Sequence, residues 1–290
     1  DDYFMGWRVN PTVMLGRNQL IDNEVNTDYC KEHKIDIFRR KSGGGCIYAD
    51  KGCIQFSYIS RAVNANEAFA AYMQRMADLL KGLKIDAQLS GRNDILINET
   101  KVSGCAFYQL SNRSVLHNSL LFDTQLDHLS NALTPAKEKL QSKGVASVRQ
   151  RVTNVATYTQ LDILAFMDYV RQEMCGTEIL ELTEEDMKEV AEIEKELASD
   201  DFVYGKNPKY SLIRKHRFEG VGTLEAHIEL KNNIIGSINM VGDYFLLGDI
   251  DHDFLSLLKG CKFTREAVEE RLENIDLSTI IRGLKLRQFL

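Results

Sequence analysis

The stretch IDIFRRKSGGGCIYADKGCIQFSYI, residues 35–59, decides the fold class of the chain. Three short runs rich in β-forming residues, at 35–38, 46–48 and 54–59, are separated by the glycine cluster at 43–45 and by a second turn. Runs of this kind, bounded by turn residues, predict strands. The stretch therefore predicts strands joined by a glycine-rich loop.

Helical and strand patterns alternate further along the chain. Between residues 64 and 83 apolar side chains recur at intervals of three and four, which is typical of one amphipathic helix. Residues 86–90 are expected to form a loop, and β-rich runs follow at 94–97, 101–107 and 115–122, with a turn at Asn98 and Glu99. A sheet with helices packed on it predicts the α+β class.

The pattern changes near residue 205. Helices are predicted at about 159–175 and 184–198, the second opened by Thr183 and Asp186 in the spacing of a capping box. Two β-rich runs then flank Asn232 and Asn233, a hairpin signal, and helical segments follow at 252–259 and 264–273. We therefore expect a large domain at 1–205 and a small one at 206–290.

Composition argues against several classes of protein. Apolar residues make up 44% and charged residues 27% of the 290 residues, as in ordinary soluble proteins. The apolar runs are far shorter than the roughly 20 residues that cross a bilayer, so no membrane span is expected. The net charge of -6 argues against nucleic acid as a partner, although it is compatible with a local basic site for a phosphate-bearing ligand.

Cysteine usage and the first residues bear on the compartment and on the start of the chain. The six cysteines are scattered without a CxxC pair, which argues against structural zinc and for reduced thiols in a cytosol or organelle matrix. The chain begins at Asp1, and residues 3–15 already resemble strand and turn, so we expect that it starts within a domain.

The sharpest local feature is RRKSGGG at residues 39–45, in which three cations stand beside three glycines. Such a loop suits phosphates, because glycine lets the backbone approach, N–H groups form an anion-binding nest and Arg supplies a bidentate fork. The alternative is a tight turn with solvated basic residues. The Walker A pattern GxxxxGK[ST] is absent, which disfavours a P-loop nucleotidase.

Two further features place polar residues beside predicted strands. SGRND at 90–94 is followed by KVSG at 101–104, and SKGVASVRQRVTN spans residues 142–154. Taken separately, Asn93 and Asp94 fit a turn before a strand, Lys101 fits a surface lysine, and the last run fits a solvated loop. None of these features identifies an enzyme by itself.

Together and in this order, the features resemble the lipoate-protein ligase A family, whose pattern includes RRxSGGG, GRNDI, K[IV]SG and SKGxxSVRxRVTN. Trp7 with PTV at 11–13, GRNQ at 16–19, and His117 before LLFD at 120–123 also match. The resemblance is strong from about residue 3 to about residue 155 and weaker in the tail. It implies the fold of biotin and lipoate ligases, a mixed sheet flanked by helices, with a small C-terminal α+β accessory domain.

The resemblance also implies an enzyme that works in two half-reactions. The carboxylate of lipoic acid attacks the α-phosphate of ATP in the presence of Mg²⁺ to give lipoyl-AMP, and a carrier lysine then attacks this acyl-adenylate. The implied acceptors are the lipoyl domains of 2-oxoacid dehydrogenase E2 subunits and the glycine-cleavage H protein. The implied compartment is the bacterial cytoplasm, or an organelle matrix in a eukaryote.

Site roles follow from the resemblance residue by residue. Lys101 would be catalytic, contacting acyl and phosphate oxygens where negative charge grows. The glycine loop would line the lipoyl and adenylate pocket with Arg40, Ser42, Gly43, Gly44 and Gly45.

Four other positions complete the expected site. Asn93 and Asp94 would hold the phosphates, with Asp94 as a ligand of Mg²⁺. His117 would lie beside the lipoyl pocket. Trp7 would wall the lipoyl channel, and packing in the core is the alternative for this aromatic side chain.

Three positions depart from the family pattern. Ala49 stands where His is usual, Cys53 where Asn is usual, and Asn118 where Gly is frequent. The start that we expect to be missing would, by resemblance, form one side of the pocket. These departures concern the detail of the site rather than membership of the family.

Three alternative functions share this fold or its partners. An acyltransferase would move octanoate or lipoate between carriers through a cysteine thioester, but residues 86–90 contain no cysteine, and Cys105 is expected to be a small buried hydrophobe. A biotin ligase fits residues 39–45 and 142–154 less well. ATP-dependent release of pyrophosphate would separate a ligase from the third alternative, a non-catalytic carrier-binding protein.

Overall fold

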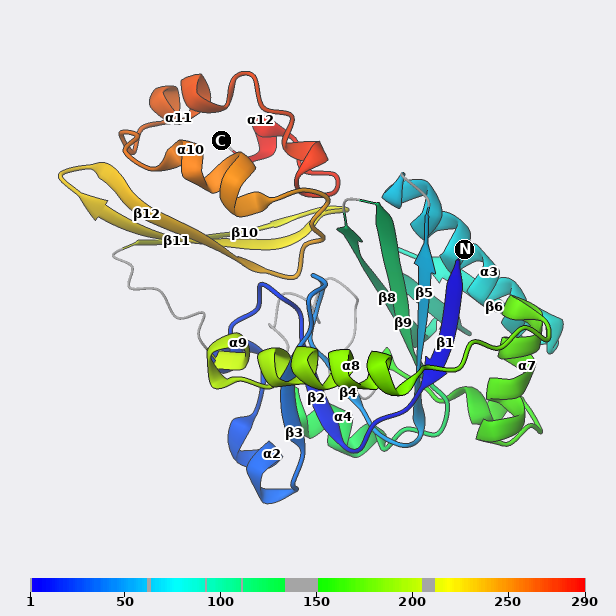
Figure 1. Cartoon of the computed structure of the whole chain (residues 1–290). Coiled ribbons are helices and arrows are strands. Elements are labelled where there is room, and N and C mark those ends of the chain that lie inside the picture. Colours follow the sequence, from blue (N-terminus) through cyan, green and yellow to red (C-terminus); the bar gives the residue numbers. More distant parts are fainter. Residues whose placement is uncertain are drawn as a thin grey trace.

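The computed structural model describes residues 2–61, 64–91, 93–110, 112–133, 151–204 and 212–289. These residues have the expected α+β architecture, with a six-stranded sheet, a three-stranded sheet beside it, and a second three-stranded sheet nearer the C-terminus (Figure 1). Within this part of the chain, no helix is long and apolar enough to cross a membrane.

The six-stranded sheet is antiparallel throughout. Asn98 and Glu99 join two of its strands with φ angles of 47° and 62°, the left-handed conformation that the commonest two-residue hairpin loops require. In spatial order the strands are β1 Tyr3–Trp7, β5 Cys53–Ser60, β9 Arg113–Leu121, β8 Thr100–Leu110, β7 Asp94–Ile97 and β6 Ala87–Ser90.

The prediction of a loop at residues 86–90 is wrong, because residues 87–90 form the edge strand β6. Its sequence, AQLS, contains no β-branched or aromatic residue, so local propensity does not mark it as a strand. Pairing with β7 makes it one, from Ala87 opposite Ile97 to Ser90 opposite Asp94.

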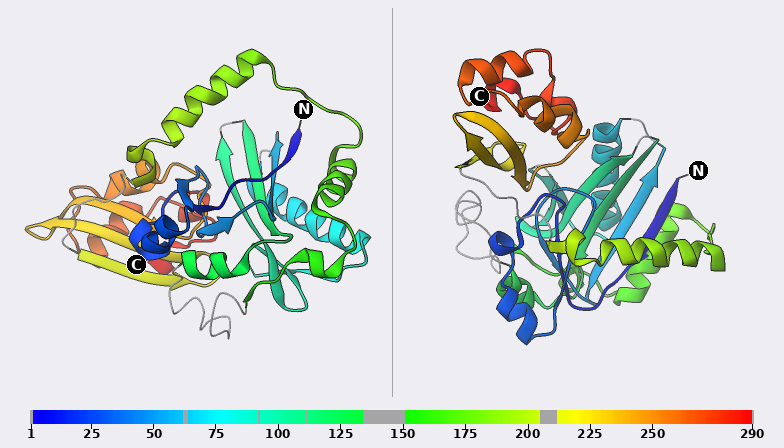
Figure 2. Two further views of the ribbon diagram at one scale, coloured as in Figure 1. Left: turned by 90° about the horizontal axis from the view of Figure 1, so that it is seen from below. Right: turned by 60° about the vertical axis from the view of Figure 1, so that its left-hand side comes forward.

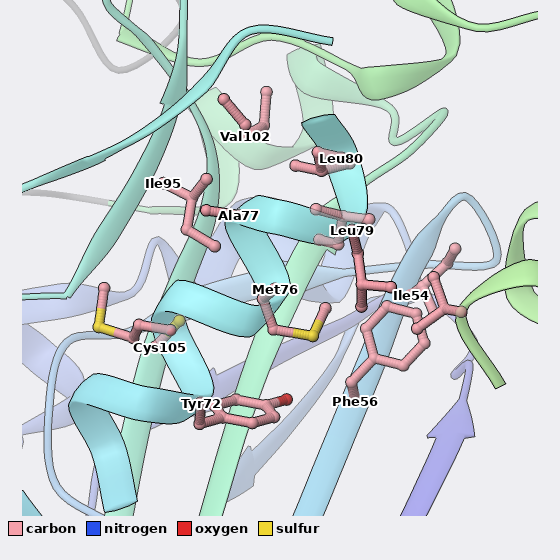
Figure 3. Close-up of a cluster of buried hydrophobic side chains, with 14 of the residues drawn as sticks. Ile54, Phe56, Tyr72, Met76, Ala77, Leu79, Leu80, Ile95, Val102 and Cys105 are labelled. Carbon is pink, nitrogen blue, oxygen red and sulfur yellow. The ribbon is translucent and has the colours of Figure 1, made fainter. Parts of the chain in front are cut away.

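One face of this sheet forms the main core. Helix α3, Ala65–Gly82, lies across that face, and its N-cap Asn64 accepts backbone hydrogen bonds from Asn66 and Glu67. Figure 3 shows Ile54, Phe56 and Val102 of the sheet around Tyr72, Met76 and Leu80 of the helix. Each fully buried side chain of this size contributes about 1.5 to 3 kcal/mol to the free energy of unfolding. Packed side chains fill this face of the sheet, and the cavity described below lies on the opposite face.

The small sheet covers part of that other face. Its central strand β2, Thr12–Leu15, is parallel to β3, Asp36–Arg39, and antiparallel to β4, Ile47–Ala49, which gives the mixed pairing that was expected. The glycine loop connects β3 to β4. Short helices lie beside this sheet: α1 Ile21–Glu24, α2 Thr27–Glu32 and α4 Leu126–Ala132.

The C-terminal unit is a sheet with helices on one side. Its hairpin turns at Asn232 and Asn233, as predicted, with φ angles of 51° and 59°. The strands are β10 Leu212–Phe218, β11 Gly222–Lys231 and β12 Ile234–Gly242. The helices are η2 Asp251–Leu255, α10 Ser256–Leu258, α11 Arg265–Leu272, η3 Leu277–Thr279 and α12 Leu286–Phe289. The boundary predicted near residue 205 lies outside the described residues.

Residues 155–204 are mainly helical, and Val155, Phe166 and Val170 in the first part of this segment pack into the main core. The helices are η1 Val155–Tyr158, α7 Ile163–Cys175, α8 Glu184–Leu197 and α9 Asp200–Tyr204. Thr183 and Asp186 form the predicted capping box. However, α8 does not pack into the large domain, because its residues 184–196 are exposed, and Figure 2 shows it along the outside of the molecule.

Candidate active site

A cavity of about 1080 Å³ is lined by the open face of the six-stranded sheet, the small sheet and the C-terminal unit. Ser42 is fully buried beside it, and Gly43 borders a second cavity instead. The expected site residues that line the main cavity are Trp7, Arg40, Gly44, Gly45, Asn93, Asp94, Lys101 and His117. The fold therefore brings together most of the residues predicted from motifs far apart in the sequence.

Arg40 organises the glycine loop from within. Its guanidinium donates hydrogen bonds to Ser42 Oγ at 3.0 Å and to the carbonyl oxygens of Gly43, Gly45 and Met14 at 2.7, 2.8 and 3.1 Å. Burial lowers the pKa of Arg40 to about 10, so the side chain is still charged at neutral pH. Because most of its donors hold the loop, Arg40 shapes the cavity wall and contributes positive charge to it.

Arg39 and Lys41, the other two cations of this loop, lie elsewhere. Arg39 is 5% exposed, and its guanidinium donates to the carbonyl oxygens of Val203 and of residues 16, 17 and 19. Arg39 therefore joins β3 to two distant segments and is structural. Lys41 is exposed at the second cavity.

Ser42 and His117 connect the glycine loop to β9. Ser42 Oγ and His117 Nε2 are 2.7 Å apart. Burial, together with the nearby charge of Arg40, lowers the pKa of His117 to about 3. The imidazole is therefore neutral at physiological pH, which suits a residue that positions the loop by hydrogen bonding rather than one that supplies charge.

The glycines of the loop allow a close approach, and the group that approaches them is the backbone of the C-terminal unit. The N–H of Gly44 donates to the Tyr244 carbonyl oxygen at 3.1 Å, and a Cβ on Gly43 would collide with the same oxygen. Gly44 has a φ of 87°, and a Cβ there would lie 2.9 Å from the ring of Phe245. Two of the glycines therefore hold the two units together.

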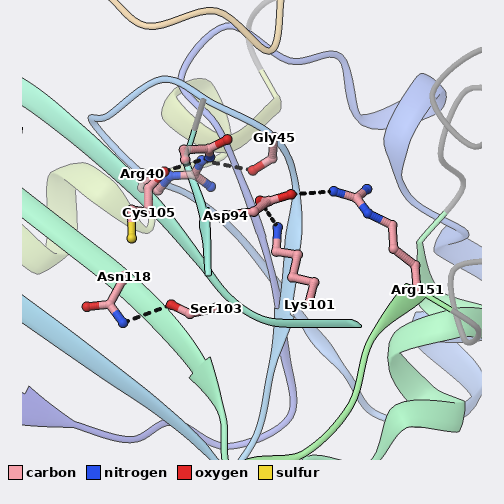
Figure 4. Close-up of polar contacts among 9 residues, drawn as sticks. Arg40, Gly45, Asp94, Lys101, Ser103, Cys105, Asn118 and Arg151 are labelled. Atoms are coloured by element: carbon pink, nitrogen blue, oxygen red, sulfur yellow. Dashed lines mark hydrogen bonds and ion pairs between the residues drawn. The ribbon is translucent and has the colours of Figure 1, made fainter. Parts of the chain in front are cut away.

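The motifs SGRND at 90–94 and KVSG at 101–104 meet the run at 142–154 through Asp94. Lys101 Nζ lies 2.7 Å from Asp94 Oδ1, and Arg151 Nη2 lies 2.8 Å from Asp94 Oδ2 (Figure 4). Room for the ammonium comes from Gly104, where a Cβ would lie 2.7 Å from Lys101 Nζ. The side chains are 6% exposed for Asp94, 23% for Lys101 and 18% for Arg151, so one buried carboxylate holds two cations at the edge of the cavity.

Two hydrogen bonds join Asn93, the residue before β7, to Cys105 on β8. Asn93 Nδ2 donates to the Cys105 carbonyl oxygen at 2.7 Å, and the Cys105 N–H donates to the Asn93 carbonyl oxygen at 2.8 Å. Burial raises the pKa of Cys105 to about 12, so its thiol is protonated at neutral pH and is a poor nucleophile.

The three departures from the family pattern are accommodated by packing. Ala49 is fully buried in the core of the small sheet, and burial raises the pKa of Cys53 to about 12. Asn118 accepts a hydrogen bond from Tyr72 Oη at 2.5 Å and donates to Ser103 Oγ at 3.0 Å. Strand alternation turns its side chain towards α3, away from that of His117.

Trp7 lines the cavity from β1. Its indole Nε1 donates to Ser57 Oγ at 3.1 Å, and the side chain is only partly buried. Trp7 therefore forms part of the cavity wall rather than part of the core.

The cavity is also lined by residues that were not predicted, and four of them bear on its chemistry. Arg151 lies in the run for which a solvated loop was the alternative, and the family motif that contains it was the available signal. Gln55 lies on a predicted strand. Arg217 and Arg282 come from the C-terminal unit, and the Arg282 guanidinium lies 4.8 Å from the ring centroid of Phe69, so only the tertiary structure reveals them.

The cavity can neutralise an anion beside apolar surface. Its cationic side chains are Arg40, Lys101, Arg151, Arg217 and Arg282. Its carboxylates are Glu24, Asp94, Glu219 and Asp243. Apolar side chains in the same cavity include Met14, Ile47, Leu121 and Leu129. A ligand with a phosphate or carboxylate end and a hydrocarbon end fits this combination.

Metal binding at this site would depend on the phosphates of the bound substrate. In the described ranges, no group of three His, Cys, Asp or Glu residues is placed to hold a metal ion. Asp94 fits as a single ligand, because its carboxylate lies at the edge of the cavity where it holds Lys101 and Arg151. This suits Mg²⁺, which is usually held by one or two carboxylates together with phosphates and water.

Comparison with known sequences agrees with this chemistry. Residues 1–175 match the lipoyl protein ligase A/B catalytic domain, and residues 207–290 match the bacterial lipoate protein ligase C-terminus. Lipoate-protein ligase LplJ of Bacillus subtilis is 31% identical, with 99% of this chain and 89% of the relative covered. Lipoate–protein ligase 1 of Staphylococcus aureus is 34% identical, with 96% and 86% covered.

Solved structures of lipoate ligases also resemble the chain. P. falciparum LipL1 in complex with lipoate has a TM-score of 0.73 at 20% identity, a likeness of fold, over 98% of this chain and 83% of that one. A bipartite lipoate protein ligase with its E2 lipoyl domain, from Thermoplasma acidophilum, has a TM-score of 0.63 at 27% identity, over 73% and 87%. Lipoate-protein ligase A bound with ATP has 0.61 at 25%, over 70% and 86%. With family matches along most of its length, this chain belongs to the lipoate-protein ligase family.

Proposed function

We propose that this protein is an ATP-dependent ligase that converts lipoic acid to lipoyl-AMP and transfers the lipoyl group to a lysine of a carrier domain. The observation that carries the proposal is the group Lys101, Asp94 and Arg151 in a cavity that is also lined by Trp7 and apolar side chains. This is an anion site combined with a place for a hydrocarbon chain. The ATP and lipoate in the related structures support the two substrates.

In the first half-reaction, a carboxylate oxygen of lipoate forms a bond to the α-phosphorus of ATP, and the bond from that phosphorus to the β-phosphate oxygen breaks. Pyrophosphate leaves. Lys101 would contact the carboxylate and the α-phosphate oxygens, where a fixed positive charge stabilises the transition state most. Arg151, held by the same Asp94 carboxylate, would bring a second cation to the phosphates.

In the second half-reaction, the neutral amine of the carrier lysine attacks the acyl carbon, the bond to the phosphate oxygen breaks, and AMP leaves while the amine loses a proton. Lys101 would stabilise the negative charge on the acyl oxygen. Arg40, Gly44 and Gly45 would form the pocket wall beside the adenylate, and the buried Ser42 and Gly43 would support that wall from behind.

The phosphate side would be completed by Asp94 and Asn93. Asp94 would contribute one oxygen ligand to Mg²⁺, which neutralises charge on ATP. Asn93 holds β7 against β8 at this point, which keeps Asp94 in place. His117 and Trp7 would contact the lipoyl group from the side of the large sheet.

The acceptors, compartment and domains follow from the same proposal. We infer that the acceptor is a lipoyl domain of a 2-oxoacid dehydrogenase or the glycine-cleavage H protein, and the complex of a related ligase with a lipoyl domain supports the first. The enzyme would work in the cytoplasm. Residues 1–205 would carry the catalysis and residues 206–290 would form the accessory domain.

The test is mass spectrometry of an apo lipoyl domain incubated with the protein, lipoic acid and Mg²⁺, with and without ATP. ATP-dependent addition of one lipoyl group to one lysine is expected. Modification only from an acylated donor protein would instead assign a transferase, which the protonated and buried Cys105 disfavours. Absence of any transfer would overturn the proposal.

A further inference from the structure

A row of four residues crosses the open face of the six-stranded sheet from the charged site to the indole. Gly104 on β8 pairs with Ser119 on β9, Ser119 pairs with Gln55 on β5, and Gln55 pairs with Trp7 on β1. All four line the main cavity. Neighbouring strands are about 4.8 Å apart, so the row spans roughly 14 Å perpendicular to the strands.

The charged end of this row is fixed by Lys101, whose ammonium lies over Gly104. The far end is the indole of Trp7. A ligand carboxylate at Lys101 would place its hydrocarbon chain across the strands, since Gly104 and Ser119 leave room above the sheet. Two strand spacings, roughly 10 Å, separate Gly104 from Gln55. This matches the reach of an extended eight-carbon acid, so the terminal part of the chain would meet Gln55.

Gln55 is an unusual side chain for the end of a hydrocarbon channel. It is 5% exposed, and its Nε2 donates to Cys53 Sγ at 3.2 Å. Sulfur is a weak acceptor, so this contact leaves much of the hydrogen-bonding capacity of the amide unused. A saturated alkyl end against the amide would bury it without compensation. The sulfur atoms of a dithiolane are polarisable and accept weak hydrogen bonds, so they suit the amide better.

We propose that Gln55 is a specificity-determining residue that selects a dithiolane-bearing acid over a saturated acid of the same chain length. The proposal rests on the proposed ligase function, because it concerns the acyl substrate of the same cavity. The competing position for the acyl chain is the part of the cavity lined by Leu121, Leu129 and Leu133. In that position the chain would not touch Gln55.

The first experiment compares the protein with its variant Gln55→Leu. The rate of pyrophosphate release is measured with lipoic acid and with octanoic acid, and the ratio of the two kcat/KM values is the readout. This ratio should fall about tenfold in the variant, mainly through KM, because an apolar side chain now meets the acyl end. Gln55→Asn, which withdraws the amide by one methylene, should move the ratio in the same direction by less.

The matched control is Gln88→Leu, the same change on the exposed edge strand β6. It should leave the ratio unchanged. A Gln55→Leu ratio equal to that of wild type, with Leu129→Ala changing it instead, would overturn the proposal and place the acyl chain at the leucines. Equal loss of activity with both acids, with a lowered melting temperature, would also overturn it, because Gln55 would then be only structural.

Binding gives a second readout that does not need turnover. Trp7 is the single tryptophan of the chain, and it ends the row. Titration of its fluorescence should show lipoate binding more tightly than octanoate, with the preference reduced about tenfold in Gln55→Leu. If the wild type bound lipoate with this preference but released no pyrophosphate, the ligase function would fail while the role of Gln55 survived. If the protein ligated lipoate but bound lipoate and octanoate equally tightly, the ligase function would stand and the role of Gln55 would fail.

Discussion

At the level of single residues, the chemistry depends on how Asp94 divides its carboxylate between two cations. Lys101 and Arg151 each take one oxygen, and Asp94 is nearly buried. Breaking such a pair leaves a charge without a partner, which costs more than the pair itself contributes. The arrangement therefore keeps an ammonium and a guanidinium in place before a ligand arrives.

Replacing Lys101 separates its chemical role from any role in folding. Lys101→Ala should lower the rate of lipoyl-AMP formation at least a hundredfold, because a charge at the developing negative oxygen is lost, which corresponds to roughly 3 kcal/mol. Arg151 should still neutralise Asp94, so the melting temperature should change little. Pyrophosphate release and thermal unfolding measure the two quantities. Lys81→Ala, which removes an exposed lysine paired with Asp78, is the control, and full activity of Lys101→Ala would contradict the assignment.

His117 predicts a dependence of stability on pH. Burial and the charge of Arg40 lower its pKa from 6.5 to about 3, so between these values the unfolded chain holds a proton that the folded chain does not. The free energy of unfolding should therefore fall as the pH drops below 6.5, by up to about 1.4 kcal/mol per pH unit from this residue, and this contribution should be constant above 6.5.

Urea unfolding of the wild type and of His117→Asn, at about pH 7.5 and about pH 5.5, tests this dependence. Asn has no proton to gain, so the variant should lose less stability on acidification. Equal losses in the two proteins would show that other groups carry the effect.

At the level of elements, the glycine loop between β3 and β4 packs against the C-terminal unit on one side and borders the main cavity on the other. Gly44 donates to the carbonyl oxygen of Tyr244, while Gly44 and Gly45 border the cavity. Arg40 holds the loop from inside. The same short loop therefore links the position of the C-terminal unit to the shape of the site.

A methyl group on Gly43 should disturb this contact. Its Cβ would collide with the backbone oxygen of Tyr244, which no side-chain rotation can relieve, so Gly43→Ala should cost about 1 to 3 kcal/mol of the free energy of unfolding. It should also lower adenylation, because Arg40 and Gly45 would shift with the loop. Urea unfolding measures the first effect. Gly236→Ala, where the nearest atom would be 3.5 Å away, is the matched control, and equal effects of both changes would refute the packing explanation.

At the level of the whole molecule, Phe245 joins the two units. Tyr244 belongs to the core of the C-terminal unit, whereas the next residue, Phe245, is fully buried in the core beneath α3. Its ring lies 6.0 Å from that of Phe69 and 5.4 Å from that of Phe107, between centroids. Arg282 of the C-terminal unit also lies over the ring of Phe69. The cavity is closed on one side by the position that these contacts give the C-terminal unit.

Phe245→Ala should loosen that position. Removal of a buried ring lowers the free energy of unfolding by about 3 to 5 kcal/mol. The ring of Phe245 packs between the two units, so its removal weakens the contact that positions them. Small-angle X-ray scattering should show a larger radius of gyration, and urea unfolding should show lower stability. Phe254→Ala removes a ring that is equally buried inside the C-terminal unit, so it should destabilise without expansion. Equal radii for the two variants would contradict the role of Phe245.

The sequence alone was sufficient to predict the features of the fold that have a local cause. The turns at residues 98–99 and 232–233, the capping box of α8, the amphipathic helix α3 and the α+β class follow from turn chemistry, capping and periodicity. The strands around the glycine loop were predicted for the same reason. Family motifs then marked Arg40, Lys101 and Asp94, all of which line one cavity.

Only the tertiary structure decided how residues distant in the sequence are paired. Strand β6 exists because β7 pairs with it, and Arg151 becomes a site residue because it reaches Asp94, 57 positions away. The glycines at 43 and 44 look like ligand contacts in the sequence, yet the C-terminal unit approaches them. Hydrogen bonding between strands and burial act between residues that are neighbours in space, so no local pattern can encode them.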